Sequence, residues 1–401
     1  MAGQIINEEM DSSINEMADF IMENCDPVKY VIDTYNKYHV GDRQLGTVML
    51  LSIANQSIIN SEGIQPKLSG ASGKGKTHAA KTMYALLPDY RKIEGSLSAK
   101  SLFYSDDLEE GTVIFSDDVK IGADLEDTLK RAMSNFQTPT IHRTLNGNRE
   151  YEELTIPPRI CWWMTSVNSD YSDELLNRLY DITVDSSVDT DKEVTCQQLS
   201  DAVTGKTTLP DIEDQEVRIC NEIILRIQKD KFKVIIPFAQ RIIWNGSNDR
   251  RNLPRFLDLI KGFTVMRHWQ RKEEADNVYL ADIQDYNDAV ALMNSNEEGL
   301  STKLTGAEIR FIKWAGGKGF LSINEVLSSY FKEDGSQYTH ETIRKMVFGT
   351  ARRAGLLSKV PGMTDSQNGQ ERRFAVPKFE TIKKVNKLVY LADEKELMVR
   401  A

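Results

Sequence analysis

The chain has 401 residues, 27% of them charged, and a formal net charge of −10. This length suffices for two or three domains, and the acidic balance argues against a protein whose whole surface binds nucleic acid. The charge is uneven, because residues 301–401 contain 18 Lys and Arg against 11 Asp and Glu, so they carry +7 and the rest of the chain −17. This asymmetry indicates a polyanionic partner for the C-terminal part alone; a solvated basic face is the alternative.

The apolar runs and the cysteine spacing argue against several further classes of protein. No stretch approaches the roughly 18 apolar residues of a membrane span, and the beginning, MAGQIINEEMDSS, lacks the basic and apolar regions of a secretory signal. We therefore expect a cytoplasmic protein with no membrane partner. The cysteines form no C-x-x-C pair, which argues against a zinc module and a disulfide framework: Cys25, Cys161, Cys196 and Cys220.

Two helical segments precede the first motif of the chain. Residues 1–38 are acidic, and their apolar positions are spaced loosely, so we interpret this N-terminal helical arm as an adaptor or a packing segment. From residue 39 the sequence HVGDRQLGTVMLLSIANQSI has the apolar density of a buried helix.

The stretch GASGKGKTH matches the phosphate-loop pattern G-x-x-x-x-G-K-[ST]. Its glycines let backbone N–H groups surround phosphate oxygens, Lys76 can reach the β and γ phosphates, and Thr77 can offer its hydroxyl to Mg²⁺. The helix predicted to begin near Lys76 adds the positive end of its dipole. We expect ATP and Mg²⁺ as cofactors, with the nucleotide held by this stretch: Gly70, Ala71, Ser72, Gly73, Lys74, Gly75, Lys76, Thr77 and His78.

Short apolar runs alternate with helical segments after this loop. They are TVIFSDD (112–118), RICWWMTS (159–166) and RLYDITVD (178–185). Such runs between helices are typical of a parallel sheet covered on both faces. The predicted fold class is therefore an α/β P-loop core, although the strand expected before the loop contains Pro66, which cannot donate to a sheet ladder.

Polar residues stand where these strands are expected to end. Asp117 and Asp118 follow the apolar run VIF, so they would emerge at its carboxyl end beside the phosphate loop. We assign Asp117 to Mg²⁺ and Asp118 to polarising the attacking water; a solvated acidic turn is the alternative. After the next strand, either Ser166 or Asn168 could reach the γ-phosphate and report its presence.

Arg178 lies just before the last predicted strand of the core. An arginine at a subunit edge could stabilise charge on a phosphate bound by a neighbouring subunit, as arginine fingers do. A local salt bridge with Asp181 or Glu174 is the alternative. The finger interpretation requires that the protein works as a ring.

Between the acidic pair and the following strand, the segment TIHRTLNGNREYEELTI predicts a hairpin whose turn begins at Asn146. His142, Arg143 and Arg149 flank that turn and could hold phosphates without reading bases. A surface hairpin with incidental charge is the alternative.

From residue 191 to 300 the apolar periodicity predicts helices only. Capping boxes then begin helices at Thr305 and Ser322. A third helix, HETIRKMVFGTARRAG, ends at Gly355, and LLSKV with RRFAVP predicts a hairpin. We expect five parts along the chain: an N-terminal helical arm (1–38), the ATPase core (39–190) with a hairpin insert (139–156), an all-α lid (191–300), a winged-helix domain (303–380) and a helical tail (381–401).

The predicted winged helix is rich in basic residues that could neutralise several phosphates, so its binding to DNA would depend on salt. Winged helices also dock proteins, which is the alternative. The candidates lie on or beside the third helix and in the hairpin: Arg344, Lys345, Arg352, Arg353, Lys359, Arg372 and Arg373.

Four motifs, GASGKGKT, VIFSDD, WWMTSVN and LLNRLYDI, resemble in order and spacing the AAA+ ring helicases of the minichromosome-maintenance type, including those of mobile elements, and the superfamily 3 viral helicases. The resemblance covers about residues 39–376. It implies a homo-oligomer, a hexameric ring, that hydrolyses ATP and moves single-stranded DNA past hairpins in its channel. It also implies a lid arginine that contacts nucleotide, with Arg255 as the nearest match and Arg251 as its rival.

The sequence departs from the family pattern at two positions. Asp118 stands where many AAA+ proteins have glutamate, and Asn168 stands one residue later than in the viral pattern. We predict an ATP-dependent DNA helicase or translocase that acts in the replication of a virus or mobile element. Two rivals remain: a helicase loader or replication initiator, and a DNA-binding regulator whose assembly is switched by ATP.

Overall fold

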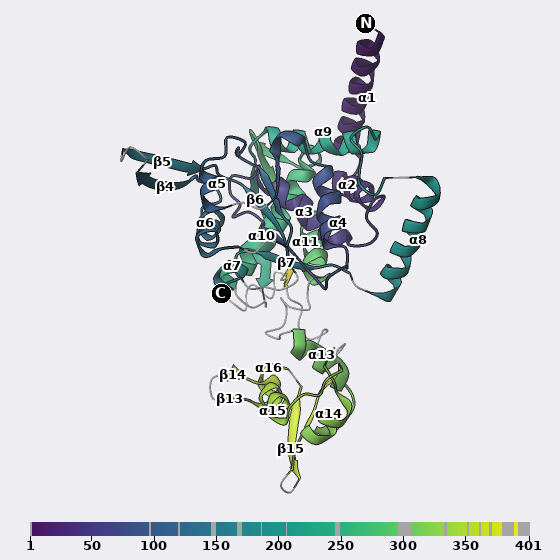
Figure 1. The fold of residues 1–401 in the computed structure, drawn as a ribbon, viewed down its shortest axis with the longest axis vertical. Coiled ribbons are helices and arrows are strands. Elements are labelled where there is room, and N and C mark those ends of the chain that lie inside the picture. The colour runs from purple at the N-terminus through teal and green to yellow at the C-terminus, as the bar shows by residue number, and fades with distance from the viewer. Residues whose placement is uncertain are drawn as a thin grey trace. The chain divides into compact units, whose positions relative to one another are not determined.

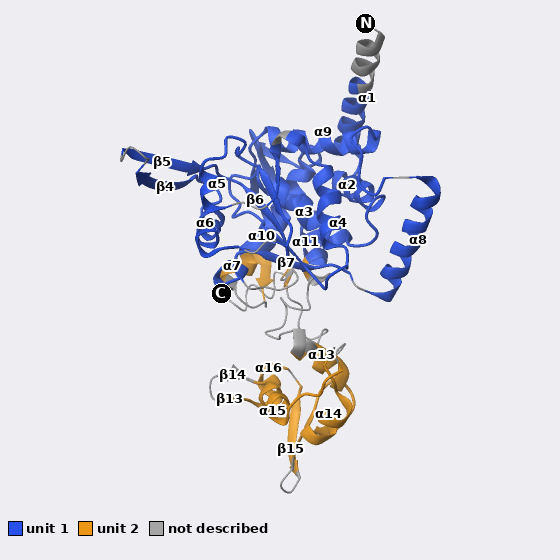
Figure 2. Cartoon of the chain, viewed as in Figure 1, with its two compact units in different colours: residues 1–239, 254–292 blue, residues 240–253, 293–401 orange. Residues whose placement is uncertain are grey.

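The chain folds into two compact units (Figure 2), which comprise residues 1–239 with 254–292 and residues 240–253 with 293–401. The first unit therefore holds the arm, the core and most of the lid. No helix in the described ranges combines the length and apolar character needed to cross a bilayer. The computed structural model describes residues 2–95, 98–118, 121–145, 150–166, 171–185, 187–205, 207–244, 249–295, 306–332, 335–350, 353–360, 362–368, 371–378 and 389–391.

A five-stranded sheet in the order β2-β3-β6-β1-β7 forms the centre of the first unit (Figure 1). All neighbouring strands pair in parallel, which confirms the predicted α/β P-loop core. Pro66 is the first residue of its strand, a position that tolerates proline. The strands are β1 (Pro66–Ser69), β2 (Lys92–Glu94), β3 (Val113–Ser116), β6 (Cys161–Ser166) and β7 (Tyr180–Thr183).

Helices cover both faces of this sheet. Trp162 and Trp163 are neighbours in β6 and point to opposite faces: Trp162 packs in a cluster with Leu129, and the indole of Trp163 donates to the hydroxyl of Ser52, 3.0 Å away. The helices of the core are α3 (Arg43–Asn55), α4 (Lys76–Ala85), α5 (Ala99–Phe103), α6 (Ala123–Ser134) and α7 (Asp173–Leu176), with a short 3-10 turn at Asp89–Arg91.

The N-terminal arm packs against the first unit. Its helices are α1 (Ala2–Asn24) and α2 (Pro27–Asn36), and α1 lies along α9 (Gln215–Lys229). Ile14 and Ile21 of α1 are buried, and Asp19 forms an ion pair with Arg226 of α9. Of the two interpretations of residues 1–38, the structure therefore favours the packing segment.

The predicted all-α lid also contains strands, which corrects the sequence prediction. Each strand is three residues long, too short to give a period-two pattern. β10 and β11 pair antiparallel, and β11 continues in parallel to β8. The elements are α8 (Val188–Thr204), β8 (Lys233–Ile235), β9 (Ile242–Trp244), α10 (Asp249–Met266), β10 (Glu273–Ala275), β11 (Val278–Leu280) and α11 (Ile283–Ser295), with 3-10 turns at Ala239–Arg241 and His268–Gln270.

From residue 306 onward, the described part of the second unit contains four helices and a three-stranded sheet in the order β12-β16-β15. The capping box at Ser322 is confirmed, and Thr305 lies outside the described residues. The elements are α13 (Gly306–Ala315), β12 (Phe320–Ser322), α14 (Ile323–Ser329), α15 (His340–Phe348), β13 (Gly349–Thr350), β14 (Arg353–Ala354), α16 (Leu356–Lys359), β15 (Thr364–Asn368), β16 (Glu371–Ala375) and β17 (Val389–Leu391).

Three predictions for this part of the chain are wrong. The third helix ends at Phe348 and not at Gly355, because Gly349, with φ of 80°, starts a strand that pairs back with β14. The segment LLSKV is the short helix α16, so the hairpin consists of β15 and β16. Within the predicted helical tail, Val389–Leu391 is a strand that pairs with β9.

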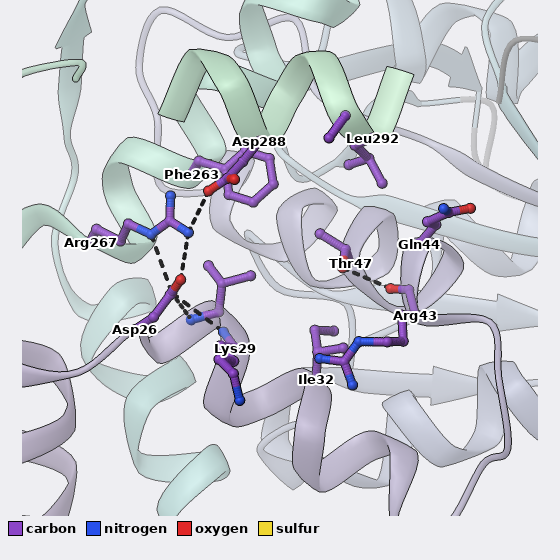
Figure 3. Close-up of a pocket in the computed structure, with 12 residues that line it drawn as sticks. Asp26, Lys29, Ile32, Arg43, Gln44, Thr47, Phe263, Arg267, Asp288 and Leu292 are labelled. Atoms are coloured by element: carbon purple, nitrogen blue, oxygen red, sulfur yellow. Dashed lines mark hydrogen bonds and ion pairs between the residues drawn. The ribbon is translucent and has the colours of Figure 1, made fainter. Parts of the chain in front are cut away.

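Buried charges connect α10 and α11 to the start of α2 (Figure 3). Arg267 donates from Nη1 to Asp285, 3.0 Å away, and from Nη2 to Asp26, 2.7 Å away, and it also pairs with Asp288. Arg271 holds the other side of Asp285. Burial raises the pKa of Asp285, but the hydrogen bonds from Arg271 and Arg267 outweigh it, so this pKa lies below its ordinary value.

Replacing Asp285 with Ala should destabilise the first unit by about 3–5 kcal/mol, because two buried guanidinium groups lose the buried carboxylate that they share. Since the folded state lowers the pKa of Asp285, its stabilisation is complete above the unfolded value of about 3.9 and is lost as the pH falls through the folded value. Urea unfolding should therefore show that the free energy of unfolding of the variant is well below that of wild type at neutral pH. This difference should become smaller in acid. Asp288→Ala, which removes a partly exposed carboxylate, is the control and should cost less.

Candidate nucleotide site

The phosphate loop connects β1 to α4 through backbone conformations that favour glycine. Gly70, Gly73 and Gly75 have φ values of 143°, 76° and 87°. A Cβ atom at Gly70 would lie 2.6 Å from Cγ2 of Val184, so a larger residue would clash there. A Cβ atom at Gly73 would meet nothing within 4 Å, so this side of the loop is open.

The side chain of Lys76 lies inside the curve of the loop. It is only 7% exposed, and its ammonium donates to the carbonyl oxygens of Gly70 and Ala71 at 2.8 and 2.9 Å. The first N–H groups of α4 begin at the same residue. A buried ammonium beside a helix N-terminus fits a polyphosphate chain, which supplies the anionic oxygens that both groups attract.

A chain of hydrogen bonds joins the loop to the acidic pair across β6. The hydroxyl of Thr77 donates to Oδ1 of Asp117 at 2.8 Å, and the hydroxyl of Thr165 donates to the same oxygen at 2.6 Å. Thr165 also accepts from the backbone N–H of Asp118 at 2.9 Å. The strand order places β6 between β1 and β3, so buried Thr165 at its end connects the two.

The two carboxylates differ in backbone conformation. Asp118 has φ of 46°, in the left-handed region that non-glycine residues seldom occupy, and such backbone strain is often found at functional sites. Both Asp117 and Asp118 are exposed, so their free oxygens can reach a ligand.

The side-chain oxygens of Thr77 and Asp117 suit a Mg²⁺ ion that also binds phosphates, and they are too few to hold a metal ion by themselves. In the part of the chain that the structure describes, no three His, Cys, Asp or Glu side chains gather as a metal-binding group. Mg²⁺ in nucleotide sites takes one or two protein oxygens and the phosphates. The bonded oxygens of Thr77 and Asp117 match that requirement.

The family comparison agrees with this geometry. The family model described as the MTBMA_p00010 P-loop domain matches residues 11–231, more than half of the chain. The chain belongs to the MTBMA_p00010 P-loop domain family. The match begins within α1 and ends just after α9, so this P-loop domain includes helices that pack on the core as well as the sheet. No curated protein matches the chain.

Two histidines brace the first turn of α4 in this P-loop domain. Nδ1 of His39 lies 2.9 Å from Nδ1 of His78, Nε2 of His39 lies 2.9 Å from Asp42, and Nε2 of His78 lies 3.0 Å from the carbonyl of Thr208. The contact between the two Nδ1 atoms needs one ring proton, and the carboxylate of Asp42 and the carbonyl of Thr208 can each accept a proton from an Nε2 atom. Burial and then the neighbouring His39 lower the pKa of His78.

The contact between His39 and His78 was not predicted from the sequence. His39 and His78 are 39 positions apart and match no ligand spacing. His78 was assigned to nucleotide binding, but both of its ring nitrogens have partners within the protein. These contacts connect His39 and Asp42 on one side, and Thr208 on the other, to the first turn of α4.

The predicted arginines of the core have partners within the same chain. Arg178 donates to the carbonyl and the carboxylate of Glu174 at 2.6 and 3.2 Å and to Ser134 at 2.9 Å. In a single subunit Arg178 therefore forms the local salt bridge with Glu174 that was the alternative interpretation. Asp181, the other candidate partner, pairs with Lys67.

The predicted sensor and lid residues are only partly described. Arg255 donates to the backbone carbonyl of Asn177 at 2.6 Å, next to Arg178 in the sequence. Arg251 belongs to the second compact unit. Asn168 and the side chain of Ser166 lie outside the described residues.

The predicted hairpin is present as β4 (Thr140–Leu145) and β5 (Tyr151–Ile156), and it projects from the first unit (Figure 1). Arg143 donates to Glu153 at 3.1 Å and to the hydroxyl of Tyr151 at 3.0 Å. The ring of His142 lies against Phe103, with 5.1 Å between ring centroids. Asn146 and Arg149 lie outside the described residues.

The basic residues assigned to the predicted winged helix also have acidic partners. Arg344 and Lys345 both pair with Glu341, and this lowers the pKa of Glu341 to about 2. In the hairpin, Arg372 pairs with Asp365, Arg373 with Glu325, and Lys359 of α16 with Glu308. Arg352 and the side chain of Arg353 lie outside the described residues.

Replacing Thr165 with Val should lower the rate of ATP hydrolysis about 10- to 100-fold, because Asp117 and Asp118 lose the group that positions them. ATP affinity should stay close to wild type, since Lys76 and the loop are unchanged. Thr165→Ser keeps the hydroxyl and should restore most of the rate. Steady-state hydrolysis with a nucleotide-binding titration measures both quantities, and a Val variant with the wild-type rate would contradict the positioning role.

Proposed function

We propose that this P-loop protein hydrolyses ATP with Mg²⁺ and uses the energy to move along DNA and unwind it as a ring of identical subunits. The observation that carries the proposal is the hydrogen-bonded line from Thr77 through Asp117 and Thr165 to Asp118, which joins the phosphate loop to the acidic pair. Both halves of a hydrolytic site are therefore adjacent in one subunit.

Each residue of this line has a role in the proposal. Lys76 exchanges its two carbonyl partners for phosphate oxygens, because a charged acceptor binds an ammonium more strongly than a carbonyl does. Thr77 and Asp117 hold Mg²⁺, which supplies charge neutralisation on the phosphates when bound. Asp118 orients the attacking water.

Arg178 provides the proposed link between subunits. Its ion pair with Glu174 lies near the surface, since the glutamate side chain is 62% exposed, and such pairs are worth about 0–1 kcal/mol. A neighbour's γ-phosphate carries more charge than a carboxylate and offers bidentate geometry, so it can replace Glu174 as the partner. Arg255 serves as the proposed lid arginine.

The second unit supports the DNA part of the proposal through the order of its elements and its charge. Its three longer helices, α13, α14 and α15, precede the hairpin of β15 and β16, as in winged helices, and only the four-residue helix α16 lies between them. Residues 301–401 carry +7. We therefore propose that this unit is a winged helix that contacts the DNA backbone. The hairpin of β4 and β5 is the proposed contact within the ring.

A second candidate function is a helicase loader or replication initiator, and the hairpin favours it. Its only described arginine, Arg143, is paired with Glu153, and Glu150 and Glu152 add further negative charge. A hairpin of this charge suits a protein partner better than a phosphate backbone.

Strand displacement from a forked DNA duplex with ATP distinguishes the two functions. Lys76→Ala should lower ATP hydrolysis at least about 100-fold and abolish unwinding, because the phosphates lose their buried cation. Arg143→Ala with Arg149→Ala should hydrolyse ATP but fail to unwind. A wild-type protein that hydrolyses ATP without displacing strands would favour the loader, and a hairpin variant that unwinds normally would refute the hairpin contact.

Mixing two inactive variants tests the ring. Lys76→Ala keeps Arg178 but has a damaged site, and Arg178→Ala keeps the site but lacks the arginine. If Arg178 acts on a neighbour's nucleotide, a one-to-one mixture should recover about one quarter of the wild-type hydrolysis rate, because about one interface in four joins an intact site to an intact arginine. Each variant alone is the control, and a mixture that stays inactive would contradict action between subunits.

A further inference from the structure

The corner between α13 and β12 in the second unit places a lysine directly over an aromatic ring. The ammonium of Lys318 lies 3.8 Å from the ring centroid of Trp314, near the end of α13. The connecting sequence is AGGKGF, and Gly317 and Gly319 take positive φ values of 77° and 82°. These glycines let the chain turn tightly, so that Lys318 folds back over the indole.

The elements next to this corner carry more basic and aromatic side chains. Phe320, at the start of β12, is 46% exposed. The aliphatic part of Lys378 lies beside the loop, because a Cβ atom at Gly317 would be 3.0 Å from its Cγ. Arg310 and Lys313 are exposed on the helix just before the tryptophan. We name this surface the α13 corner: Arg310, Lys313, Trp314, Lys318, Phe320 and Lys378.

Trp314 is the first of a series of aromatic rings in contact with one another. Its ring centroid lies 4.9 Å from that of Tyr330, which in turn stacks on Tyr338 at 5.2 Å with an interplanar angle of 3°. Phe311, which is fully buried in the core of the unit, packs against the rings of Trp314 and Tyr330. The indole is therefore held in a fixed orientation, and this lowers the entropy lost when a flat ligand stacks on it.

Lys318 differs from the basic residues of α15 in its electrostatic surroundings. Within the described ranges, no carboxylate lies within ion-pair distance of Lys318, whereas Arg344 and Lys345 share Glu341. A phosphate that approaches Arg344 or Lys345 must compete with Glu341. A phosphate that approaches Lys318 meets a cation whose described contact is an aromatic face.

We propose that the α13 corner binds single-stranded nucleic acid, with one unpaired base stacked on Trp314 and with Lys318 moved from the indole face to a neighbouring phosphate. This inference names the substrate form for the DNA contact in the proposed function and rests on that function. A base offers a larger face to the indole than an ammonium does, and base–aromatic stacking exceeds an exposed cation–π contact. A duplex cannot use the site in this way, because its base faces are already stacked.

Binding of a short fluorescein-labelled oligothymidylate to the full chain, followed by anisotropy without nucleotide, tests the proposal. Trp314→Leu should weaken binding about tenfold or more, and Trp314→Phe, which keeps a ring, should retain most of the affinity. Lys318→Ala with Lys378→Ala should lower the dependence of log K on log salt by about 1.4. Lys192→Ala with Lys272→Ala removes the same charge from exposed sites of the first unit and is the matched control.

A second measurement keeps the test valid if Trp314→Leu fails to fold, which thermal melting would reveal. Oligonucleotide binding should quench part of the tryptophan emission of wild type, and Trp314→Phe should lack that part while still binding. Loss of single-strand affinity in Trp314→Leu with little change for a blunt duplex would support the proposal. Unchanged single-strand affinity, an equal loss for duplex, or quenching that persists in Trp314→Phe would overturn it.

The inference and the proposed function can fail separately. If wild type displaces no strands but Trp314→Leu loses single-strand binding, the motor proposal falls and the α13 corner stands. If wild type unwinds a fork and Trp314→Leu binds and unwinds like wild type, the motor proposal stands and the α13 corner falls.

Discussion

The geometry of the nucleotide site depends on two hydrogen bonds made by the hydroxyl of Thr165. One buried oxygen donates to Asp117 and accepts from the backbone of Asp118, so it fixes the end of β3 relative to the end of β6. Thr77 completes the connection from the other side of β6. Because these contacts lie within one subunit, the loop and the acidic pair are already positioned relative to each other before a ligand binds.

The sequence predicted those parts of the site that are encoded by adjacent residues. The loop and the acidic pair were recognisable because each is a short motif with a strand before it. The role of Thr165 depends on β6 lying between β1 and β3, and strand order is a property of the folded sheet that no local pattern contains. The contact between His39 and His78 was missed for the same reason, since it joins residues far apart in the chain.

The same distinction explains the errors in the lid and the second unit. Strands of three residues, such as β8 and β11, give no measurable periodicity, and their existence depends on each other as pairing partners. The third helix of the second unit could stop at Gly349 or Gly355, and the pairing of β13 with β14 decides for the first. Charge was counted correctly from the sequence, but the carboxylate partners of Arg143, Arg178 and Arg344 could be seen only in the fold.

The helix α8 buries none of its side chains, all of which the structure describes, and it stands apart from the other helices of its unit (Figure 1). A helix of 17 residues without packing is close to the length at which helix and coil are balanced in water. Its order therefore depends on its N-terminal end, where Ser187 caps the first turn and Asp191 pairs with Lys74 of the phosphate loop. The helix–coil balance of α8 is therefore thermodynamically linked to whether Lys74 pairs with Asp191 or with another anion.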